Sequence, residues 1–387
     1  MHPTALPVRI AVNTRLLLRN KLEGIGRFTW EVLRRMVVDH PEHQFYFIFD
    51  RPYAEEFVDF SNVTPVVLGP PARHPFLFVW WFELSVASWL NKYQPDVFLS
   101  PDGYLSLRAN VKQVAVMHDL NFEHFPDDLP FLVRRYYRYF FPKFAQKATR
   151  IATVSEFSAG DIASLYGVDR AFIDVVYNGV DEVFTRANDH QIEAFKARFT
   201  QGADFFLNVG SIHPRKNTVR MLQAFERFRA MHPERHTLLV LVGDAYWWSA
   251  EMKRALAQSP FRSDVVLTGR LPDSDLAIAL SAAQALIYVS YFEGFGIPMI
   301  EAMRCGTPVV AAQTTALPEV AGEAALYVDP YQVESIAEGL ACISSHPQLR
   351  ESLVEKGKLQ AQKYTWRDAA QRLWRTIENT QHAGQIR

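Results

Sequence analysis

Residues 289–312 read VSYFEGFGIPMIEAMRCGTPVVAA, and this stretch indicates both the fold and the place of a binding site. It continues a strand-like run at 285–290 and then passes into a helical pattern. Pro298 suits the first position of a helix, because the N–H that proline lacks would have no partner there. Gly294 and Gly296 let the backbone approach a ligand closely. The helix would direct its free N–H groups and positive dipole end at phosphate or hydroxyl oxygens.

Two glutamates flank this predicted helix start. Glu293 lies on the loop, and Glu301 lies in the first turns of the helix. Carboxylates accept hydrogen bonds from sugar and ribose hydroxyls, so the arrangement suits a nucleotide sugar. The alternative is a helix-capping carboxylate together with a surface glutamate.

Short β-rich runs alternate with helical stretches in both halves of this 387-residue chain, a length at which two domains are expected. In the first half these runs lie at 8–13, 44–50, 96–100, 111–117, 150–154 and 173–177. In the second half they lie at 205–209, 237–242, 264–268, 285–290, 308–311 and 325–328. Nearly continuous apolar strands that alternate with helices predict an α/β fold with two parallel sheets, each buried on both faces.

The boundary between the domains is indicated by the polar segment 178–204, which contains the turn signal Asn178-Gly179. We expect one domain at 1–180 and a second at 181–365. Ligands of open parallel sheets bind beyond the carboxyl ends of the strands. A substrate is therefore expected in a cleft between the two domains.

A second predicted helix start carries two adjacent cations. The run GSIHPRKN (210–217) ends a strand and opens a helix that Asn217 or Thr218 can cap. Arg215 offers a planar fork and Lys216 a compact charge. Together they suit a diphosphate whose charge grows as its bond to the sugar breaks. A solvated basic turn is the alternative interpretation.

The first half offers weaker signals at the ends of two strands. Gly24 and Gly26 open an amphipathic helix like half of a dinucleotide fingerprint, but Thr29 stands where the third glycine belongs. This argues against NAD and leaves a glycine hinge near phosphate or acceptor, with a plain turn as the alternative. His118 ends an apolar strand, where ligands bind, or is a structural histidine. Asp119 would orient its ring or cap the next segment.

Net charge, cysteine spacing and the N-terminal residues argue against several classes of protein. A net charge of −1 gives no overall attraction to nucleic acid. Cys305 and Cys342 show neither a disulfide framework nor metal-ligand spacing, which favours a reducing compartment. Residues 1–7 lack the pattern of a secretory signal, so we expect a cytoplasmic protein. Asp273-Ser274-Asp275 is interpreted as a helix N-cap, and no metal site is expected.

Basic and aromatic side chains interleave at 131–150, beginning with Arg134, Arg135 and Arg138. This mixture predicts contact with an anionic membrane surface, with a solvated helix face as the alternative. The most apolar run, 75–90, is shorter than the ~20 residues of a membrane span. We expect it to form a buried or interfacial helix.

Taken in order, these motifs resemble the large family of retaining glycosyltransferases with the GT-B fold, family 4 or glycosyl transferases group 1, which includes bacterial mannosyl- and glucosyltransferases. The matching pieces are 289–312, GIGRF (24–28), MHDL (117–120), TVSEFS (153–158), YNGVD (177–181), GSIHPRKN (210–217) and TGRLPDSDL (268–276). The glutamate pair within 289–312 is the most specific of them. The resemblance implies two facing Rossmann-like domains with a cleft between them. It also implies a C-terminal helix at 366–387 that packs back on the first domain.

The same resemblance implies roles for individual residues. Glu301 would bind the ribose hydroxyls, Glu293 would face the donor sugar, and His118 would line the sugar site. Arg215 and Lys216 would hold the diphosphate. They are adjacent here, whereas many relatives separate them by several residues, so their individual roles stay open. The other implied donor contacts are Gly24, Gly26, Gly269, Arg270, Gly294, Phe295 and Gly296.

The activity implied is transfer of a hexose from a nucleoside diphosphate sugar to a hydroxyl of a saccharide or lipid-linked saccharide, without metal or cofactor. The subgroup with adjacent Arg and Lys is rich in mannosyltransferases of bacterial surface polysaccharides, which implies GDP-mannose as donor. Such an enzyme would act in the cytoplasm, at the inner face of the cell membrane. A sugar-nucleotide epimerase or phosphorylase on the same fold, and a non-catalytic sugar-binding subunit, are the alternatives.

Overall fold

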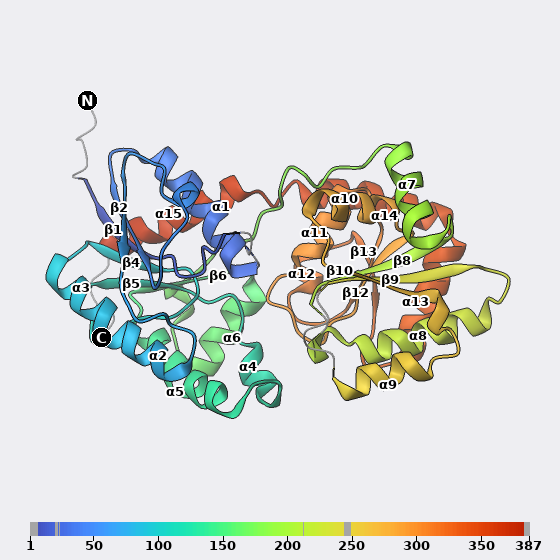
Figure 1. The fold of residues 1–387 in the computed structure, drawn as a ribbon, viewed down its shortest axis with the longest axis horizontal. Helices are drawn as coiled ribbons and strands as arrows, with labels where there is room; N and C mark the ends of the chain where they lie inside the picture. The colour runs from blue at the N-terminus through green and yellow to red at the C-terminus, as the bar shows by residue number, and fades with distance from the viewer. Residues whose placement is uncertain (1–6, 20–21, 23, 212, 244–248, 383–387) are drawn as a thin grey trace. The chain divides into compact units, whose positions relative to one another are not determined.

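The computed structural model describes residues 7–19, 22, 24–211, 213–243 and 249–382. The chain forms two units, of which one is Met1–Gly179 together with Trp366–Arg387 and the other is Val180–Thr365. Each unit is built on one sheet whose strand pairs are parallel, with helices on both faces (Figure 1). The α/β class with two parallel sheets is confirmed.

The N-terminal unit contains a sheet of strand order β3-β2-β1-β4-β5-β6-β7. Its strands are β1 (Arg9–Asn13), β2 (Gln44–Phe49), β3 (Val63–Val67), β4 (Val97–Ser100), β5 (Lys112–Val116), β6 (Arg150–Thr153) and β7 (Ile173–Val175). The sequence pattern identified all of these strands except β3. That strand lies at the edge of the sheet, where Pro65 is tolerated because the outer side of the strand needs no N–H donor.

Helices cover both faces of this sheet. They are α1 (Gly24–Asp39), α2 (Pro75–Trp80), α3 (Ala87–Tyr93), α4 (Asn121–His124), α5 (Phe131–Lys147), α6 (Glu156–Tyr166) and α15 (Trp366–His382), with short turns η1 (Glu55–Phe57), η2 (Trp81–Val86), η3 (Pro126–Asp128) and η4 (Arg170–Phe172). Phe28 of α1 shares one apolar core with Val12 of β1 and with Trp366 and Leu373 of α15. The C-terminal helix therefore packs on the N-terminal unit, as the resemblance implied.

The apolar run at 75–90 is helical throughout, as α2, the π-helical turn η2 and the start of α3. Trp81 and Phe82 are buried, whereas Phe76 is 70% and Trp80 56% exposed. The segment thus packs one side on the sheet and leaves aromatic rings on the other. Among the described residues, no helix combines the length and the hydropathy that crossing a membrane requires.

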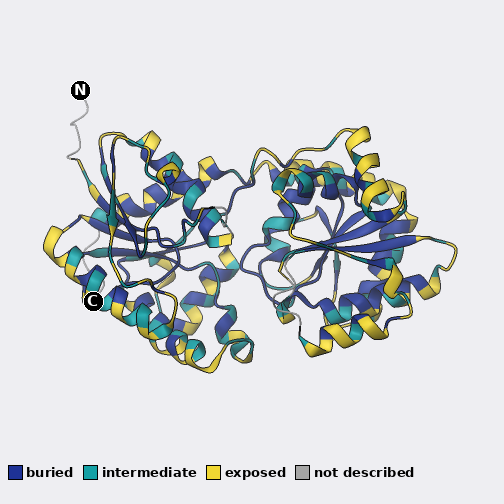
Figure 2. Ribbon diagram, in the orientation of Figure 1, coloured by how far each residue is buried: buried dark blue, intermediate teal, exposed yellow. Residues whose placement is uncertain are grey.

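The C-terminal unit contains a sheet of strand order β10-β9-β8-β11-β12-β13. Its strands are β8 (Asp204–Val209), β9 (Thr237–Val242), β10 (Val265–Gly269), β11 (Ala285–Tyr288), β12 (Val309–Ala312) and β13 (Ala325–Val328). The helices are α7 (Asp189–Thr200), α8 (Thr218–Met231), α9 (Ala250–Gln258), α10 (Asp273–Ala282), α11 (Ile297–Arg304), α12 (Leu317–Ala321), α13 (Val333–Ser345) and α14 (Pro347–Ala361), with turns η5 (Pro214–Lys216) and η7 (Arg262–Asp264). Figure 2 shows the strands buried beneath these helices.

Strand order reverses once in each sheet. In the N-terminal unit the reversal lies between β1 and β4, and in the C-terminal unit between β8 and β11. Loops that leave the carboxyl ends of two such strands diverge to opposite faces of the sheet, which opens a crevice where ligands bind. The residues after β8 and β11 are therefore the first place to look for a site.

Candidate active site

A cluster of charged side chains lies at the reversal point of the C-terminal sheet. Arg215 and Lys216 come from η5, which follows β8, and Glu293 comes from the loop after β11. Lys216 and Glu293 are buried, with 9% and 6% of their surfaces exposed. The two glycine-containing motifs, which are separate in sequence, are thus brought together.

Glu293 is held by cations on both of its carboxylate oxygens. Oε1 lies 2.5 Å from Lys216 Nζ, and Oε2 lies 2.9 Å from an Arg215 guanidinium nitrogen. Lys216 Nζ also donates to the hydroxyl of Tyr288, at 2.9 Å. Arg215 in addition donates to the backbone oxygen of Phe292, at 3.0 Å. The sequence motifs predicted the three charged residues but not this pairing, nor the contact with Tyr288.

The charge state of Glu293 follows from these contacts. Burial by itself would raise the pKa of Glu293, but Arg215 and Lys216 more than offset it and lower that pKa from 4.5 to about 2. Glu293 is therefore ionised at neutral pH. Burial raises the pKa of Tyr288 well above its usual range, so its hydroxyl stays protonated.

The helix after Glu293 begins where the sequence predicted, within one residue. Gly296 takes the N-cap position with a left-handed φ of 102°, α11 starts at Ile297, and Pro298 occupies the second position rather than the first. This left-handed φ favours glycine, and a Cβ on Gly296 would also come within 2.9 Å of the side-chain ends of Leu317 and Met299. Glu301 lies inside α11 and is 5% exposed.

Three glycines line the carboxyl ends of β8, β9 and β10. The N–H of Gly210 donates to the oxygen of Val242, and the N–H of Gly243 donates to the oxygen of Gly269. A Cβ on Gly243 would lie 1.9 Å from the oxygen of Gly210, which no side chain permits. Gly269 was predicted from its motif, whereas Gly243 was not, because a lone glycine after a strand does not reveal which backbone passes beside it. Arg270 follows β10 and is exposed.

Two helix caps differ from the sequence prediction. Asn217 stands before α8, but its side chain does not cap the helix, because Nδ2 donates to the oxygens of Val289 and Pro330. The N-cap predicted within 273–275 is Pro272 instead, and α10 begins at Asp273. The two aspartates lie in the first turn, where carboxylates interact favourably with the helix dipole.

The candidate residues of the N-terminal unit also lie near its strand reversal. Gly26 is in the first turn of α1, and a Cβ there would lie 2.8 Å from the oxygen of Leu16. Gly24 begins the same helix with a φ of 37°. His118 follows β5 and meets the ring of Phe28 edge-on, at 4.9 Å between centroids. Burial lowers the pKa of His118, so the imidazole is neutral at neutral pH.

Asp119 follows His118 and was expected either to orient the His118 ring or to cap the next segment. Oδ1 of Asp119 accepts the N–H of Asn121 at 3.1 Å, at the start of α4. Asp119 thus supplies an acceptor for the first N–H of α4, although the N-cap position itself is occupied by Leu120. In the C-terminal unit, the ring of Phe295 is buried and packs edge-on against Tyr364, while Gly294 is buried beside it.

A possible set of metal ligands lies elsewhere in the described part of the chain. His40, Glu42 and His43 place one ligand atom each within 4.8 Å of one another. Nδ1 of His43 accepts the N–H of Val8, so the neutral ring carries its proton on Nε2 and offers no lone pair there. His40 stacks on Trp374 of α15 at 3.7 Å. The group fits the packing of α15 better than it fits a cation.

Comparisons with known proteins match both units. A family model described as Glycosyltransferase Family 4 matches residues 22–184, and one described as Glycosyl transferases group 1 matches residues 189–360. The chain is 27% identical over 361 residues to O-antigen chain mannosyltransferase B of Escherichia coli, covering 90% of this chain and 94% of that protein. It is 28% identical over 238 residues to O-antigen chain mannosyltransferase RfbU of Salmonella typhimurium, covering 61% and 62%. The crystal structure of Anabaena HepE in complex with UDP and glucose superposes with a TM-score of 0.74 at 16% identity, covering 96% and 99%.

Proposed function

Because this chain is a glycosyltransferase of family 4 with the GT-B fold, we propose that it transfers a hexose from a nucleoside diphosphate sugar to a hydroxyl of a saccharide acceptor, with retention of anomeric configuration. One observation carries the proposal. Two cations and a carboxylate converge at the reversal point of the C-terminal sheet, beside the start of α11.

The cluster of Arg215, Lys216 and Glu293 can bind both a diphosphate and a sugar. Arg215 and Lys216 supply positive charge that a diphosphate can share with Glu293, and the negative charge of that diphosphate increases as its bond to the sugar breaks. Glu293 accepts hydrogen bonds and, ionised, can take them from sugar hydroxyls. Glu301, one turn into α11, is proposed to bind the ribose.

The reaction proposed for this site needs no covalent enzyme intermediate. The bond between the anomeric carbon and the diphosphate oxygen breaks, and a bond from the acceptor oxygen to that carbon forms on the same face. The acceptor proton passes to the leaving phosphate oxygen. Arg215 and Lys216 stabilise the departing diphosphate, so the charge is met by side chains, and we propose that no metal ion is required.

Mannose, supplied by GDP-mannose, is the proposed sugar, and synthesis of a bacterial surface polysaccharide or glycolipid is the proposed setting, in the cytoplasm. The support is that the two relatives described above are O-antigen chain mannosyltransferases. The HepE structure was determined with UDP and glucose, but its 16% identity speaks only to the fold.

Donor choice and reaction class can be tested in one experiment. The protein is incubated with GDP-mannose, UDP-glucose, UDP-galactose or UDP-N-acetylglucosamine, with and without a saccharide acceptor. We expect thermal stabilisation and turnover with GDP-mannose, and a product whose anomeric configuration, read by NMR, equals that of the donor. Conversion of a donor to its epimer without acceptor would replace transfer by epimerisation. Absence of stabilisation by every donor would contradict the proposal.

A surface on α5 supports peripheral contact with an anionic membrane, where a lipid-linked acceptor would be found. An open pocket of about 620 Å³ is lined by Pro126, Asp127, Phe131, Arg134, Arg135, Arg138 and Tyr139. Phe131 is 59% exposed and Tyr139 57%. The predicted patch at 131–150 is narrower in the structure, because α5 ends at Lys147 and Arg150 is paired with Asp174 at 2.7 Å. Arg134 is also paired, with Asp127 at 2.5 Å, and this pair lies at the exposed edge of the patch.

Vesicle co-sedimentation tests the membrane contact. We expect binding to anionic vesicles that weakens with salt, since exposed charges are screened over ~10 Å at 0.1 M ionic strength. Each basic side chain near such a surface contributes ~1 kcal/mol, so replacing Arg134, Arg135 and Arg138 with serine should abolish most of it. The matched control replaces three exposed lysines of the other unit with serine, namely Lys356, Lys358 and Lys363. Equal losses in both triple variants, or no binding at low salt, would contradict the contact.

A further inference from the structure

A tight turn follows β4 at the strand reversal of the N-terminal sheet. The N–H of Gly103 donates to the oxygen of Ser100 at 3.2 Å, which places Pro101 at the second position of the turn, where proline is favoured. Gly103 has a left-handed φ of 81°, and a Cβ there would lie 3.3 Å from the oxygen of Val116. The turn is therefore pressed against the end of β5, two residues before His118.

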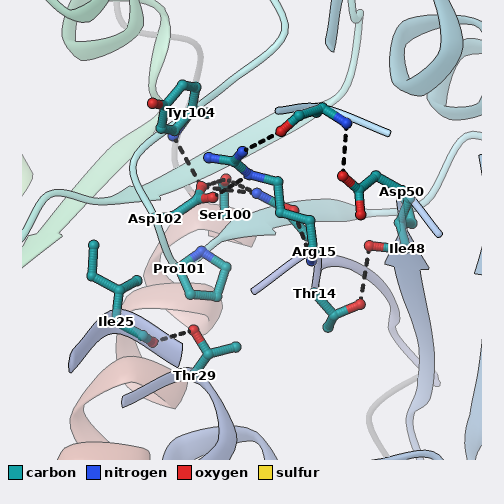
Figure 3. A network of polar contacts seen from close by, with 12 residues as sticks. Thr14, Arg15, Ile25, Thr29, Ile48, Asp50, Ser100, Pro101, Asp102 and Tyr104 are labelled. Carbon is teal, nitrogen blue, oxygen red and sulfur yellow. Dashed lines mark hydrogen bonds and ion pairs between the residues drawn. The ribbon is translucent and has the colours of Figure 1, made fainter. Parts of the chain in front are cut away.

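Buried polar groups hold this turn from the side of β1. Oδ1 of Asp102 accepts from Asn13 Nδ2 at 2.8 Å, from Ser100 Oγ at 3.0 Å and from the N–H of Tyr104 at 3.3 Å. Oδ2 accepts from Arg15 Nε at 2.7 Å. Figure 3 shows Arg15 reaching Asp102 beside Ser100, Pro101 and Tyr104.

Arg15 is enclosed to an unusual degree for a charged residue. Its side chain is 8% exposed and that of Asp102 is 4% exposed. The guanidinium carbon lies 4.4 Å from the centre of the Tyr104 ring, with Phe78 and Phe82 also around it. A buried ion pair contributes little net stability, because desolvation offsets its attraction, so its presence here calls for another explanation.

The carbonyl of the turn determines which ring nitrogen of His118 carries the proton. Nε2 of His118 lies 2.9 Å from the oxygen of Pro101. A carbonyl oxygen can only accept, so Nε2 must be the protonated nitrogen. The neutral ring then keeps its lone pair on Nδ1, which can only accept a hydrogen bond.

We infer that Arg15 and Asp102 are positioning residues for sugar transfer: they hold the turn at 100–103, and its Pro101 carbonyl fixes His118 as the tautomer whose Nδ1 can accept a hydrogen bond from a sugar hydroxyl. The inference rests on the proposed sugar transfer. It gives the buried pair of Arg15 and Asp102 a role in positioning His118. The small net contribution of a buried ion pair to folding stability would not explain its presence.

The experiment compares two paired variants of the full chain. Arg15→Met with Asp102→Ala removes both charges and the anchor of the turn, and leaves no unpaired buried charge. Arg15→Met with Asp102→Asn also removes both charges, but keeps an oxygen that can accept from Asn13 and the N–H of Tyr104. The matched control applies the first change to a distant ion pair of the same unit, Arg150→Met with Asp174→Ala.

Two measurements are made on each variant. Side-chain ¹⁵N chemical shifts, assigned with His118→Gln, report which nitrogen of His118 carries the proton. Steady-state kinetics report kcat and the KM of the donor. For the Met/Ala pair we expect a mixture of tautomers and about tenfold lower kcat, the size of one lost hydrogen bond. Donor KM should change less than twofold, because neither Arg215 nor Lys216, which are proposed to hold the diphosphate, belongs to the turn or to the residues that anchor it.

The control pair should keep the Nε2–H tautomer and a near wild-type kcat. The Met/Asn pair loses Arg15 but keeps an acceptor for Asn13 and the N–H of Tyr104, so it should fall between the Met/Ala pair and the wild type in both measurements. A Met/Asn pair equal to the wild type would remove Arg15 from the positioning role. An unchanged tautomer in the Met/Ala pair, or an equal fall of kcat in the control pair, would overturn the inference. If the Met/Ala pair does not fold, Gly103→Ala disturbs the same turn and carries the same expectations. Lack of sugar transfer by the wild-type protein would refute the proposed function, whereas the tautomer measurement needs no turnover and separates the two failures.

Discussion

Replacing Glu293 by glutamine should destabilise the ligand-free protein by an amount that the structure predicts. Arg215 and Lys216 lower the pKa of Glu293 from 4.5 to about 2. At 1.36 kcal/mol per pKa unit, the ionised carboxylate is stabilised by about 3 kcal/mol over its neutral form. Glutamine has the shape of the neutral form, so Glu293→Gln should lose about this much. For a unit of this size that corresponds to a melting transition lower by roughly 6–12 °C.

Acid should remove the difference between the two proteins. Because the pKa of Glu293 is lower in the folded state, its stabilisation is complete above pH 4.5 and is lost as pH falls from 4.5 toward 2. The melting temperatures of wild type and Glu293→Gln should therefore converge over that range. A gap that stays constant with pH would refute the assignment of the pKa to the ion pair.

A nucleoside diphosphate should raise the melting temperature, whereas the Glu293→Gln substitution lowers it. In Glu293→Gln the cations no longer have a carboxylate partner, so the diphosphate of GDP or UDP replaces it without competition. We expect the ligand to raise the melting temperature of the variant more than that of the wild type, while sugar transfer falls. Glu351→Gln, on the exposed surface of α14, is the matched control and should change neither quantity. Weaker stabilisation of the variant than of the wild type would show that the diphosphate does not use these cations.

Three further outcomes are expected. Sugar transfer should survive EDTA, and a complete loss restored by Mg²⁺ or Mn²⁺ would reveal a metal site that the proposal lacks. Glu301→Ala should weaken nucleoside diphosphate binding by ~1–3 kcal/mol in calorimetric titration, whereas unchanged affinity would remove Glu301 from the ribose site. Gly243→Ala should lower the melting temperature and weaken nucleotide binding, because its Cβ would meet the oxygen of Gly210 at 1.9 Å. Gly160→Ala, in α6 with nothing within 4 Å of its Cβ, should be tolerated.

Local patterns predicted the parts of the fold that depend on local physics. Buried parallel strands are continuous apolar runs, so β1, β5 and β11 are evident from composition alone. The edge strand β3 was missed, because half-exposed residues and Pro65 interrupt its pattern. Helix α7 was missed because it lies within a stretch that is polar enough to resemble a linker.

The residue types of the site could be predicted from the sequence, but the contacts between these residues could not. Glu293, Arg215 and Lys216 follow strands, and the topology of parallel sheets brings strand ends to one edge. That Lys216 would bond to a glutamate and a tyrosine more than seventy positions away depends on the strand order, which no local pattern shows. For the same reason Arg15, buried against Asp102, carried no signal in the sequence.

The return of α15 to the N-terminal unit reverses the usual order of folding during synthesis. Domains of a growing chain generally fold as units, the first one first. Here Val180–Thr365 is one continuous segment of the chain, and it is synthesised before α15. The core of the N-terminal unit includes Trp366, Leu373 and Ile377 of α15, so it can be completed only after these residues have been synthesised. Until they emerge, the apolar face of α1 stays open to water and to chaperones, so the half of the molecule that is translated first is completed last.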